Sequence, residues 1–390
     1  MSPVTITGAN HAILTVSMDG TTNLQLAQQF ATLVNNAAAA NTLAASLLSD
    51  VAAVLPAPAA GFLGEAEIDA SSLNIAWPAG YNAILDVAAG PTTISAALAV
   101  TPISVLSASG GTTFFAGAAQ TMFIAGGGNN VFNGFVSPAG ITSLPGAGSS
   151  TLNMVATGGG NDTITTGTGN FDVDPGTGRN VVTLGTGISY VNSLGQDLIT
   201  GGDAHTTAGV PNIGTIYLSG TGATVQGGTG TLAILASNGI TSPGGGLDVV
   251  TLGSGGGSIT GVSNSTFNLA GTASVTGGGN DTINMGSASA TVLGAAGADL
   301  FRIGSASSSL TGGAGAANLY EFQATATGGA TDVIGDFKTA DKLSISGYTA
   351  NGAAVLANAT VSGGSTTITL SDQTKIVLTN FASLTGGNFS

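Results

Sequence analysis

Large apolar residues recur every nine positions in one stretch of the chain. Residues 276–320, cut into nines, read TGGGNDTIN, MGSASATVL, GAAGADLFR, IGSASSSLT and GGAGAANLY. Position eight is always large and apolar, after six small or turn-forming positions. A glycine-rich turn followed by one inward side chain with outward neighbours is typical of a short β-strand. The position-eight residues are Ile283, Val292, Phe301, Leu310 and Leu319.

A second block, residues 157–192, keeps the same phase. It reads TGGGNDTIT, TGTGNFDVD, PGTGRNVVT and LGTGISYVN, and isolated copies occur at residues 125–133, 227–235 and 243–251. One such repeat cannot bury its apolar side chain alone, whereas stacked repeats can. We therefore predict a mainly β fold, a parallel β-solenoid whose core is a ladder of position-eight side chains. In this block these are Ile164, Val173, Val182 and Val191.

The flanking segments have other patterns. Residues 21–53 lack Gly and Pro and have apolar residues at helical spacing, which predicts one or two helices. From residue 321 we expect the nine-residue period to give way to longer alternating segments that form a β cap. The predicted organisation is a strand-and-helix region at 1–64, a candidate docking module, then a solenoid at 65–320 and a C-terminal cap at 321–390.

Composition restricts the partners more than the fold. Only 6% of the residues are charged, 64 are glycine, none is cysteine, and the formal net charge is −14. The 43% hydrophobic content argues against disorder. All five basic residues follow position 178, so we expect no basic patch for nucleic acid or anionic lipid.

The repeat resembles that of the RTX (repeats-in-toxin) family, G-G-x-G-x-D-x-U-x, over at least residues 157–192 and 276–320. The resemblance implies a right-handed parallel β-roll in which two repeats form one turn. It also implies calcium between stacked turns, held by the position-six Asp and by glycine carbonyls. The chain departs from the family pattern where Asn130 and Asn180 replace that Asp, and where other residue types occupy position six.

Position six is aspartate in four repeats, at Asp162, Asp248, Asp281 and Asp299. If two repeats form a turn, Asp281 and Asp299 stack directly, while the GSASAT and GSASSS segments between them leave the opposite edge without a carboxylate. Calcium takes 6–8 oxygen ligands, which stacked aspartates and turn carbonyls can supply. The candidate calcium ligands are Asp281 with Asp299, Asp162 with Asn180, and Asp248.

A second interpretation of these residues stays open. Asp and Asn also cap tight turns through hydrogen bonds to their own backbone, with no ion involved. Asp172 and Asp174 lie outside the repeat phase, and we expect them to face solvent.

The C-terminal segment also resembles those of RTX proteins. TDVIGDFKTADKLSISGY and the residues after it look like the tails that type I secretion reads as an uncleaved signal. The N-terminus has no Lys or Arg before an apolar core, so no Sec signal is evident. No uninterrupted apolar stretch is long enough for a membrane helix. We expect export from a Gram-negative bacterium through the type I apparatus, without membrane insertion.

Sequence motifs for catalysis are lacking. There is no G-x-S-x-G, H-E-x-x-H or Gly-Lys phosphate loop, and no cysteine nucleophile. A carboxylate pair suffices for glycoside hydrolysis, which makes Glu65, Glu67, Asp69 and Glu321 the residues to weigh. His205 is expected to be a loop residue. We expect no enzyme activity.

A rigid body of Thr, Ser and Ala with little charge tends to associate. The leading hypothesis is an extracellular structural protein that self-assembles as a filament or surface layer in a bacterial coat or biofilm, and folds with calcium. One alternative is an adhesin or ligand-binding module, with an aromatic patch near Phe114. The other is an ice-binding solenoid, because threonines share repeat position three at Thr168, Thr177, Thr186 and Thr229.

Overall fold

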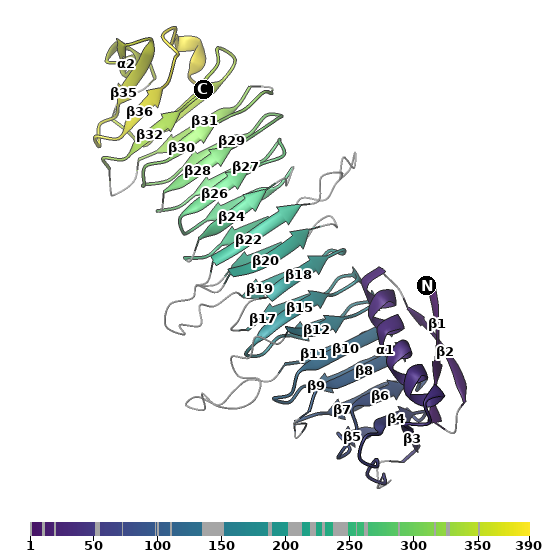
Figure 1. The fold of residues 1–390 in the computed structure, drawn as a ribbon. Helices are drawn as coiled ribbons and strands as arrows, with labels where there is room; N and C mark the ends of the chain where they lie inside the picture. The colour runs from purple at the N-terminus through teal and green to yellow at the C-terminus, as the bar shows by residue number, and fades with distance from the viewer. Residues whose placement is uncertain are drawn as a thin grey trace, which may run out of the picture. The chain divides into compact units, whose positions relative to one another are not determined.

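The structure is a computed structural model that describes residues 2–9, 12–18, 21–50, 55–71, 73–97, 99, 101–109, 111–134, 152–185, 189–201, 213–218, 224–227, 231–236, 249–254, 256–260, 264–287, 289–315, 317–324, 328–349 and 352–390. The chain divides into two compact units, an N-terminal unit of Met1–His205 and a C-terminal unit of Thr206–Ser390. In each unit parallel strands stack turn upon turn (Figure 1). The predicted mainly β, parallel β-solenoid is confirmed.

The N-terminal unit has two parallel sheets. The covered sheet consists of β3 Leu43–Leu48, β4 Leu63–Ile68, β6 Ala83–Asp86, β8 Ile103–Ser109, β10 Thr121–Gly127, β12 Leu152–Ala156, β15 Asn170–Asp174 and β18 Ser189–Ser193, in that order. The open sheet consists of β5 Asn74–Ala76, β7 Thr92–Ser95, β9 Thr112–Phe115, β11 Val131–Asn133, β14 Thr163–Thr165, β17 Val181–Leu184 and β19 Leu198–Gly201. In the turns, β13 Gly159–Gly160 pairs with β16 Thr177–Gly178.

The C-terminal unit repeats this plan. One sheet consists of β20 Ile213–Leu218, β22 Thr231–Ala236, β24 Gly257–Thr260, β26 Ala273–Thr276, β28 Ala290–Leu293, β30 Ser309–Thr311, β32 Thr331–Ile334 and β36 Lys375–Leu378. The other consists of β21 Thr224–Gly227, β23 Val249–Leu252, β25 Thr266–Leu269, β27 Thr282–Met285, β29 Leu300–Ile303, β31 Leu319–Gln323 and β33 Lys342–Ser346.

An antiparallel segment ends the C-terminal unit. β35 Ser365–Thr369 pairs antiparallel with β36 and with β34 Thr360–Ser362. The short helices α2 Gly352–Ala357 and η2 Gly386–Asn388 accompany these strands. Antiparallel strands cannot continue the parallel coil, so this segment closes the last turn.

The position-eight ladder forms the core, as predicted. Ile164, Val182, Val173 and Val191 are all 0% exposed. Val182 follows Ile164 on the open sheet, while Val191 follows Val173 on the covered sheet. Consecutive repeats thus alternate between sheets, and two repeats form one turn.

The last repeat of the 276–320 block departs from the predicted phase. Tyr320, not Leu319, is buried at 0% exposure and pairs with Phe301, while Leu319 faces outward beside Leu300. The turn before β31 is one residue longer than its predecessors. A one-residue shift moves every side chain of a strand to the other face, so the prediction for Leu319 is wrong.

The solenoid also continues beyond residue 321, contrary to the expected loss of the nine-residue period. Residues 327–335 read TGGATDVIG, with Ile334 buried at position eight on β32. Residues 336–344 read DFKTADKLS, with Leu343 buried at position eight on β33. The six extra residues 321–326, which come before these two repeats, hide the period in the sequence.

One helix, α1 Thr21–Ala39, forms in the region where one or two were predicted. Asn41, two residues after its end, has φ 56°. Thr42 N donates to Ala37 O at 2.8 Å and Asn41 N to Ala38 O at 3.1 Å. This is a Schellman cap. The residues after it, LAASLL, form β3 because they pair with β4, so a second helix is not formed there.

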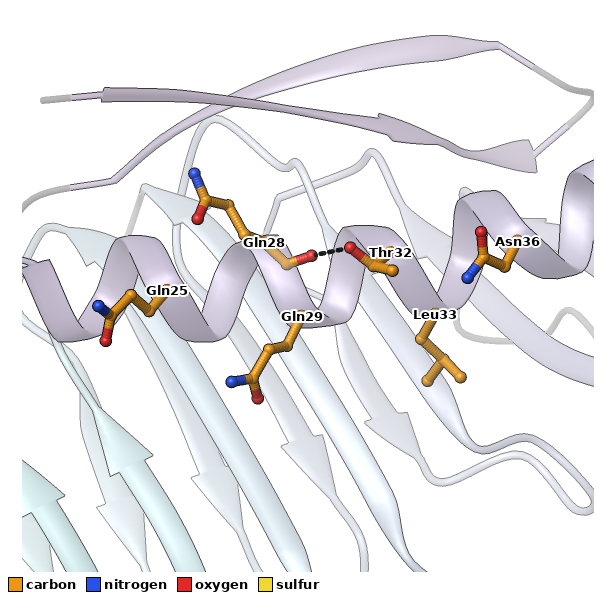
Figure 2. Close-up of a pocket in the computed structure, with 6 residues that line it drawn as sticks. All are labelled: Gln25, Gln28, Gln29, Thr32, Leu33 and Asn36. Carbon is orange, nitrogen blue, oxygen red and sulfur yellow. Dashed lines mark hydrogen bonds between the residues drawn. The ribbon is translucent and has the colours of Figure 1, made fainter.

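A cap made of α1 and the antiparallel hairpin β1 Ser2–Thr7 with β2 Ile13–Met18 packs on the covered sheet (Figure 1). Nineteen residues make a helix of about 28 Å, close to the ~24 Å across the six strands from β3 to β12. Phe30, Leu26 and Val34 of α1 are buried against Leu85 and Ile124 of the sheet. The outward face of α1 is uncharged and borders a shallow depression lined by Gln25, Gln28, Gln29, Thr32, Leu33 and Asn36 (Figure 2).

The outer surface of the open sheet, here the open face, is not buried. Its outward residues are all exposed or half-buried, and all are uncharged. They form two files, Asn74, Thr93, Thr113, Val131, Thr163, Val181, Leu198 and Ala76, Ser95, Phe115, Asn133, Thr165, Thr183, Thr200.

Candidate metal centre at the edge ladders

Position six of the repeats forms a hydrogen-bonded ladder along one edge of each unit. In the C-terminal unit, Ser265 N donates to Asp281 Oδ1 at 2.9 Å, and Asp281 N to Asp299 Oδ1 at 2.8 Å. Asp299 N then donates to Asn318 Oδ1 at 2.9 Å, and Asn318 N to Asp341 Oδ1 at 2.8 Å. Asp281 and Asp299 therefore lie on successive turns of one edge, as predicted.

The N-terminal unit has the same edge ladder. Thr112 N donates to Asn130 Oδ1 at 3.0 Å, and Asn130 N to Asp162 Oδ1 at 2.6 Å. Asp162 N donates to Asn180 Oδ1 at 2.8 Å, and Asn180 N to Asp197 Oδ1 at 3.1 Å. The Asp and Asn members of both ladders are at most 2% exposed. Each side chain thus satisfies a buried amide of the preceding turn.

This geometry explains why Asn replaces Asp at position six. Both side chains offer an Oδ1 acceptor, and the acceptor is what the neighbouring amide requires. The amide also donates: Asn130 Nδ2 contacts Asp162 Oδ1 at 3.0 Å, and Asn180 Nδ2 contacts Asp197 Oδ1 at 2.9 Å. In the N-terminal unit the two types alternate, which keeps carboxylates apart. Asp281 and Asp299 are neighbouring carboxylates in the C-terminal ladder.

Three ladder members were not found from the sequence, namely Asp197, Asn318 and Asp341. The repeats of Asp197 and Asp341 lack most of the glycines, so the family pattern does not match them, while the one-residue shift before β31 puts Asn318 at position seven of its repeat. A simpler sequence signal finds all three residues: in both ladders the acceptor comes two residues before the inward apolar side chain. Asp197 precedes Ile199, and Asp341 precedes Leu343.

The opposite edge of the C-terminal unit is not free of carboxylates. Ser308 N donates to Asp332 Oδ1 at 2.9 Å, and Asp332 is 0% exposed. The prediction of an edge without acid concerned GSASAT and GSASSS alone, and the next turn of that edge carries Asp332. Asp332 occupies position six of residues 327–335, a repeat that six extra residues separate from the preceding one.

Burial controls the protonation of the ladder. Loss of hydration raises the pKa of Asp281 to about 7, and the nearby charge of Asp299 adds to the effect, while hydrogen bonds from Ser265 and Gly279 oppose it. Burial likewise raises the pKa of Asp299 to about 6 and that of Asp332 to about 7. Burial also raises the pKa of Asp162 and Asp197. Near neutral pH the Asp281–Asp299 pair is therefore only partly ionised.

Some of the oxygen atoms around Asp281 and Asp299 are placed to bind a hard cation, and others are not. Oδ2 of Asp299 is buried without a hydrogen-bond partner in the described part of the chain, and it lies beside Gly294, near the Gly312 carbonyl. Such an orphaned oxygen with nearby carbonyls is what Ca²⁺ uses. Oδ1 of each ladder carboxylate, however, already accepts a backbone amide, and no cluster of three or more His, Cys, Asp or Glu suited to a metal occurs among the described residues.

The remaining candidates are placed as follows. Asp248 and His205 lie outside the described residues. Asp172 is half-buried, whereas Asp174 is only 6% exposed and accepts Gly176 N at 3.2 Å, so its predicted solvent position is wrong. Thr177, one of the position-three threonines considered for ice binding, pairs with Gly159 of the preceding turn. A glycine therefore interrupts the row of threonines at that position.

The carboxylates weighed for catalysis are not gathered in a cleft. Glu65 and Glu67 are buried on β4, where Glu67 Oε2 accepts Ala9 N at 2.6 Å. Glu321 lies on β31 and pairs with Arg302 at 2.9 Å. Phe114, Phe123 and Phe132 are buried in contact within the core, with centroids 5.3–5.7 Å apart, so they form no ligand patch.

No protein-family model matches the chain, and no curated protein is similar to it in sequence. None of the helices described in the structure has both the length and the apolar character needed to cross a bilayer.

Proposed function

We propose that this chain is a non-enzymatic extracellular structural protein that self-assembles into a filament or surface layer, as in a bacterial coat or biofilm matrix. The observation that carries the proposal is the open face, a seven-strand surface with no charged residue. Sheet surfaces of monomeric proteins normally carry charges that keep copies apart.

The distribution of acidic residues supports the same conclusion. Ten of the 16 acidic residues that the structure describes are buried, so the formal charge of −14 overstates the repulsion between two copies. These buried acids are Glu65, Glu67, Asp86, Asp162, Asp174, Asp197, Asp281, Asp299, Asp332 and Asp341.

Membership of the RTX family, with calcium-assisted folding after type I export from a Gram-negative cell, is part of the proposal. Its support is the paired-repeat solenoid with acceptors at position six and the orphaned Oδ2 of Asp299. The ion would be held by Asp281 and Asp299 with turn carbonyls, and in the N-terminal unit by Asp162 beside Asn180.

Electron microscopy of the purified full-length chain, with 1 mM calcium and with a chelator, tests the assembly. We expect regular filaments or sheets that grow with concentration. Monodisperse particles at high concentration in both conditions would contradict the proposal.

An ice-binding function has one observation in its favour. The outward residues Ser258, Ser274, Thr291 and Ser309 form a file across β24, β26, β28 and β30, and Thr260, Thr276 and Thr311 occupy a second file that Leu293 interrupts. Thermal hysteresis of the purified chain tests this function directly. Freezing behaviour equal to that of an inert protein at the same concentration would remove it.

A further inference from the structure

The open face of the N-terminal unit combines two properties that seldom occur together. It is accessible, and it carries large apolar side chains: Phe115 is 43% exposed, and Val181 and Leu198 are each 41% exposed. Thr163 and Thr183 beside them add methyl groups and neutral hydroxyls. An accessible apolar patch of this kind on a soluble protein commonly marks an interaction site.

The equivalent surface of the C-terminal unit differs, although it is built from the same kind of strands. There the outward positions include Arg302, Glu321 and Lys342. Arg302 donates to Glu321 Oε2 at 2.9 Å and to Asn284 Oδ1 at 3.4 Å. Charged side chains thus occur on the equivalent surface of the C-terminal unit, whereas the open face of the N-terminal unit has none.

We propose that the open face of the N-terminal unit packs against the open face of a second copy of this chain. The inference rests on the self-assembly proposed above and names the surface that carries it. A second copy is the occupant that fits, because parallel strands repeat every ~4.8 Å and only a surface with the same repeat can match the side-chain files turn by turn. It also brings an equally uncharged surface, so no charge is buried unpaired.

The size of the face sets the strength of the contact. Seven strands at ~4.8 Å by about four residues of strand length give a footprint of about 440 Å² per copy. That is roughly half of the ~800 Å² per partner in a stable interface. We therefore expect weak, concentration-dependent pairing, which becomes tight only where many copies are held together.

Symmetry fixes one contact. In a two-fold, face-to-face pair the middle strand of the seven, β11, faces its own counterpart whether the two solenoid axes run in the same or in opposite directions. Asn133 on β11 therefore lies near the axis. Thr200 on the last strand, β19, faces its counterpart only if the axes run in the same direction.

Single-cysteine variants of the full-length chain give the first test of the pairing. Because the chain has no cysteine, Asn133→Cys places a single thiol on the face, and sheets pack ~10 Å apart, within reach of a short bis-maleimide. We expect cross-linked dimers for Asn133→Cys and none for Ser274→Cys in the C-terminal unit, with Thr200→Cys reporting the direction. Equal cross-linking of Asn133→Cys and Ser274→Cys would indicate random collision and overturn the proposal.

A charge on the face gives the second test. Val181→Lys should raise the dimer dissociation constant in sedimentation equilibrium at least ~10-fold, because two like charges would face a dry apolar surface. Thr282→Lys, at an outward position of β27 in the C-terminal unit, is the matched control and should leave it unchanged. If the wild type assembles but Val181→Lys assembles equally well, this surface is wrong and the proposed function stands. A wild type that is monomeric at all concentrations contradicts both.

Discussion

At the scale of single residues, the edge ladders show that one side-chain atom can explain a sequence pattern. The Oδ1 atoms of position six accept amides from the preceding turn, at distances between 2.6 and 3.1 Å. The buried amide needs an acceptor, and Asp and Asn supply it equally well. Charge is secondary in this role, and it is costly where two carboxylates are neighbours, as at Asp281 and Asp299.

Substitutions of Asp299 separate the contribution of the Oδ1 acceptor from that of the negative charge. Asp299→Asn keeps the Oδ1 acceptor for Asp281 N, so without calcium we expect equal or higher stability at pH 7.5. Asp299→Ala leaves that amide unsatisfied and should lower the free energy of unfolding by about 1–3 kcal/mol. Urea unfolding of both variants in a chelator measures the difference. Equal losses in the two variants would show that the charge, not the acceptor, is required.

Glu65 is a buried acid of a different kind. It is 0% exposed beneath the cap, and neither carboxylate oxygen has a hydrogen-bond partner in the described residues. Burial, and then the nearby Glu67, raises its pKa to about 8 from an ordinary value of 4.5. The strands β1, β2 and β3 and the helix α1 contribute no ionisable side chain to offset this.

Burial of Glu65 makes the stability of the folded chain depend on pH. Because its pKa is higher in the folded chain, Glu65 favours folding at low pH, and that contribution is lost as the pH rises from about 4.5 to about 8. We expect Glu65→Gln to melt at a higher temperature than the wild type at pH 8.5 and to show a flatter melting curve against pH. Glu321→Gln, on an accessible ion pair, is the control and should leave the slope unchanged. A slope unaltered by Glu65→Gln would contradict the assignment.

At the scale of elements, a single helix of the cap, α1, packs across six strands of the covered sheet. α1 lies across the covered sheet, and Asn35 fixes the hairpin by accepting Thr7 N at 2.8 Å and donating to Thr5 O at 3.1 Å. The helix has no charged residue, and intrinsic helix propensity alone supplies little of a helix's stability in a protein. Its stability comes from the apolar side chains that it buries against the sheet.

The cap therefore depends on Phe30, which is 0% exposed at its centre. Phe30→Ala removes a buried ring, and we expect a loss of about 3–5 kcal/mol in the free energy of unfolding of the cap, seen as faster amide exchange in α1 and β1. Gln29→Ala, one residue away on the outward face, should change exchange little. Protection that persists in Phe30→Ala would show that the hairpin alone holds the cap.

The strand assignments show where sequence patterns succeed at this scale. A regular nine-residue period gave the strands around Val182 and Ile283 correctly, because strand and turn lengths are constant there. One extra residue in the turn before β31 moved Leu319 outward. The sequence predicts helix for LAASLL because a short apolar run has no decisive period, whereas pairing with β4 makes this segment a strand.

At the scale of the whole molecule, calcium is the proposed link between folding and location. A site with a dissociation constant of about 100 μM adds ~1.4 kcal/mol of stability at 1 mM ion and almost nothing at cytosolic concentrations. We expect a melting temperature a few degrees higher in 1 mM calcium than in EGTA. The double variant Asp281→Asn with Asp299→Asn should reduce that difference, and the further change Asp162→Asn should abolish it. An equal melting temperature in calcium and EGTA would remove calcium and leave the solenoid intact.

The sequence by itself determined the solenoid, because an apolar residue every nine positions can be buried only by identical neighbours above and below. Two repeats per turn, and with them the stacking of Asp281 on Asp299, were what the resemblance to the RTX repeat implied, and the strand register agrees. The glycines belong to the same rule: Gly279 has φ 118°, and a Cβ there would overlap the carbonyl oxygen of Ala296.

Only the tertiary structure decided which sheet face is covered, where insertions shift the register, and how many acids are buried. Most of the strands that the cap covers lie far from it along the chain, as Ile124 does from Phe30. No local sequence pattern predicts that α1 packs on the covered sheet and leaves the open face accessible to solvent. Burial of Glu65 and accessibility of Val181 are results of that packing, because both residues lie on short strands of similar pattern and differ in what lies above them.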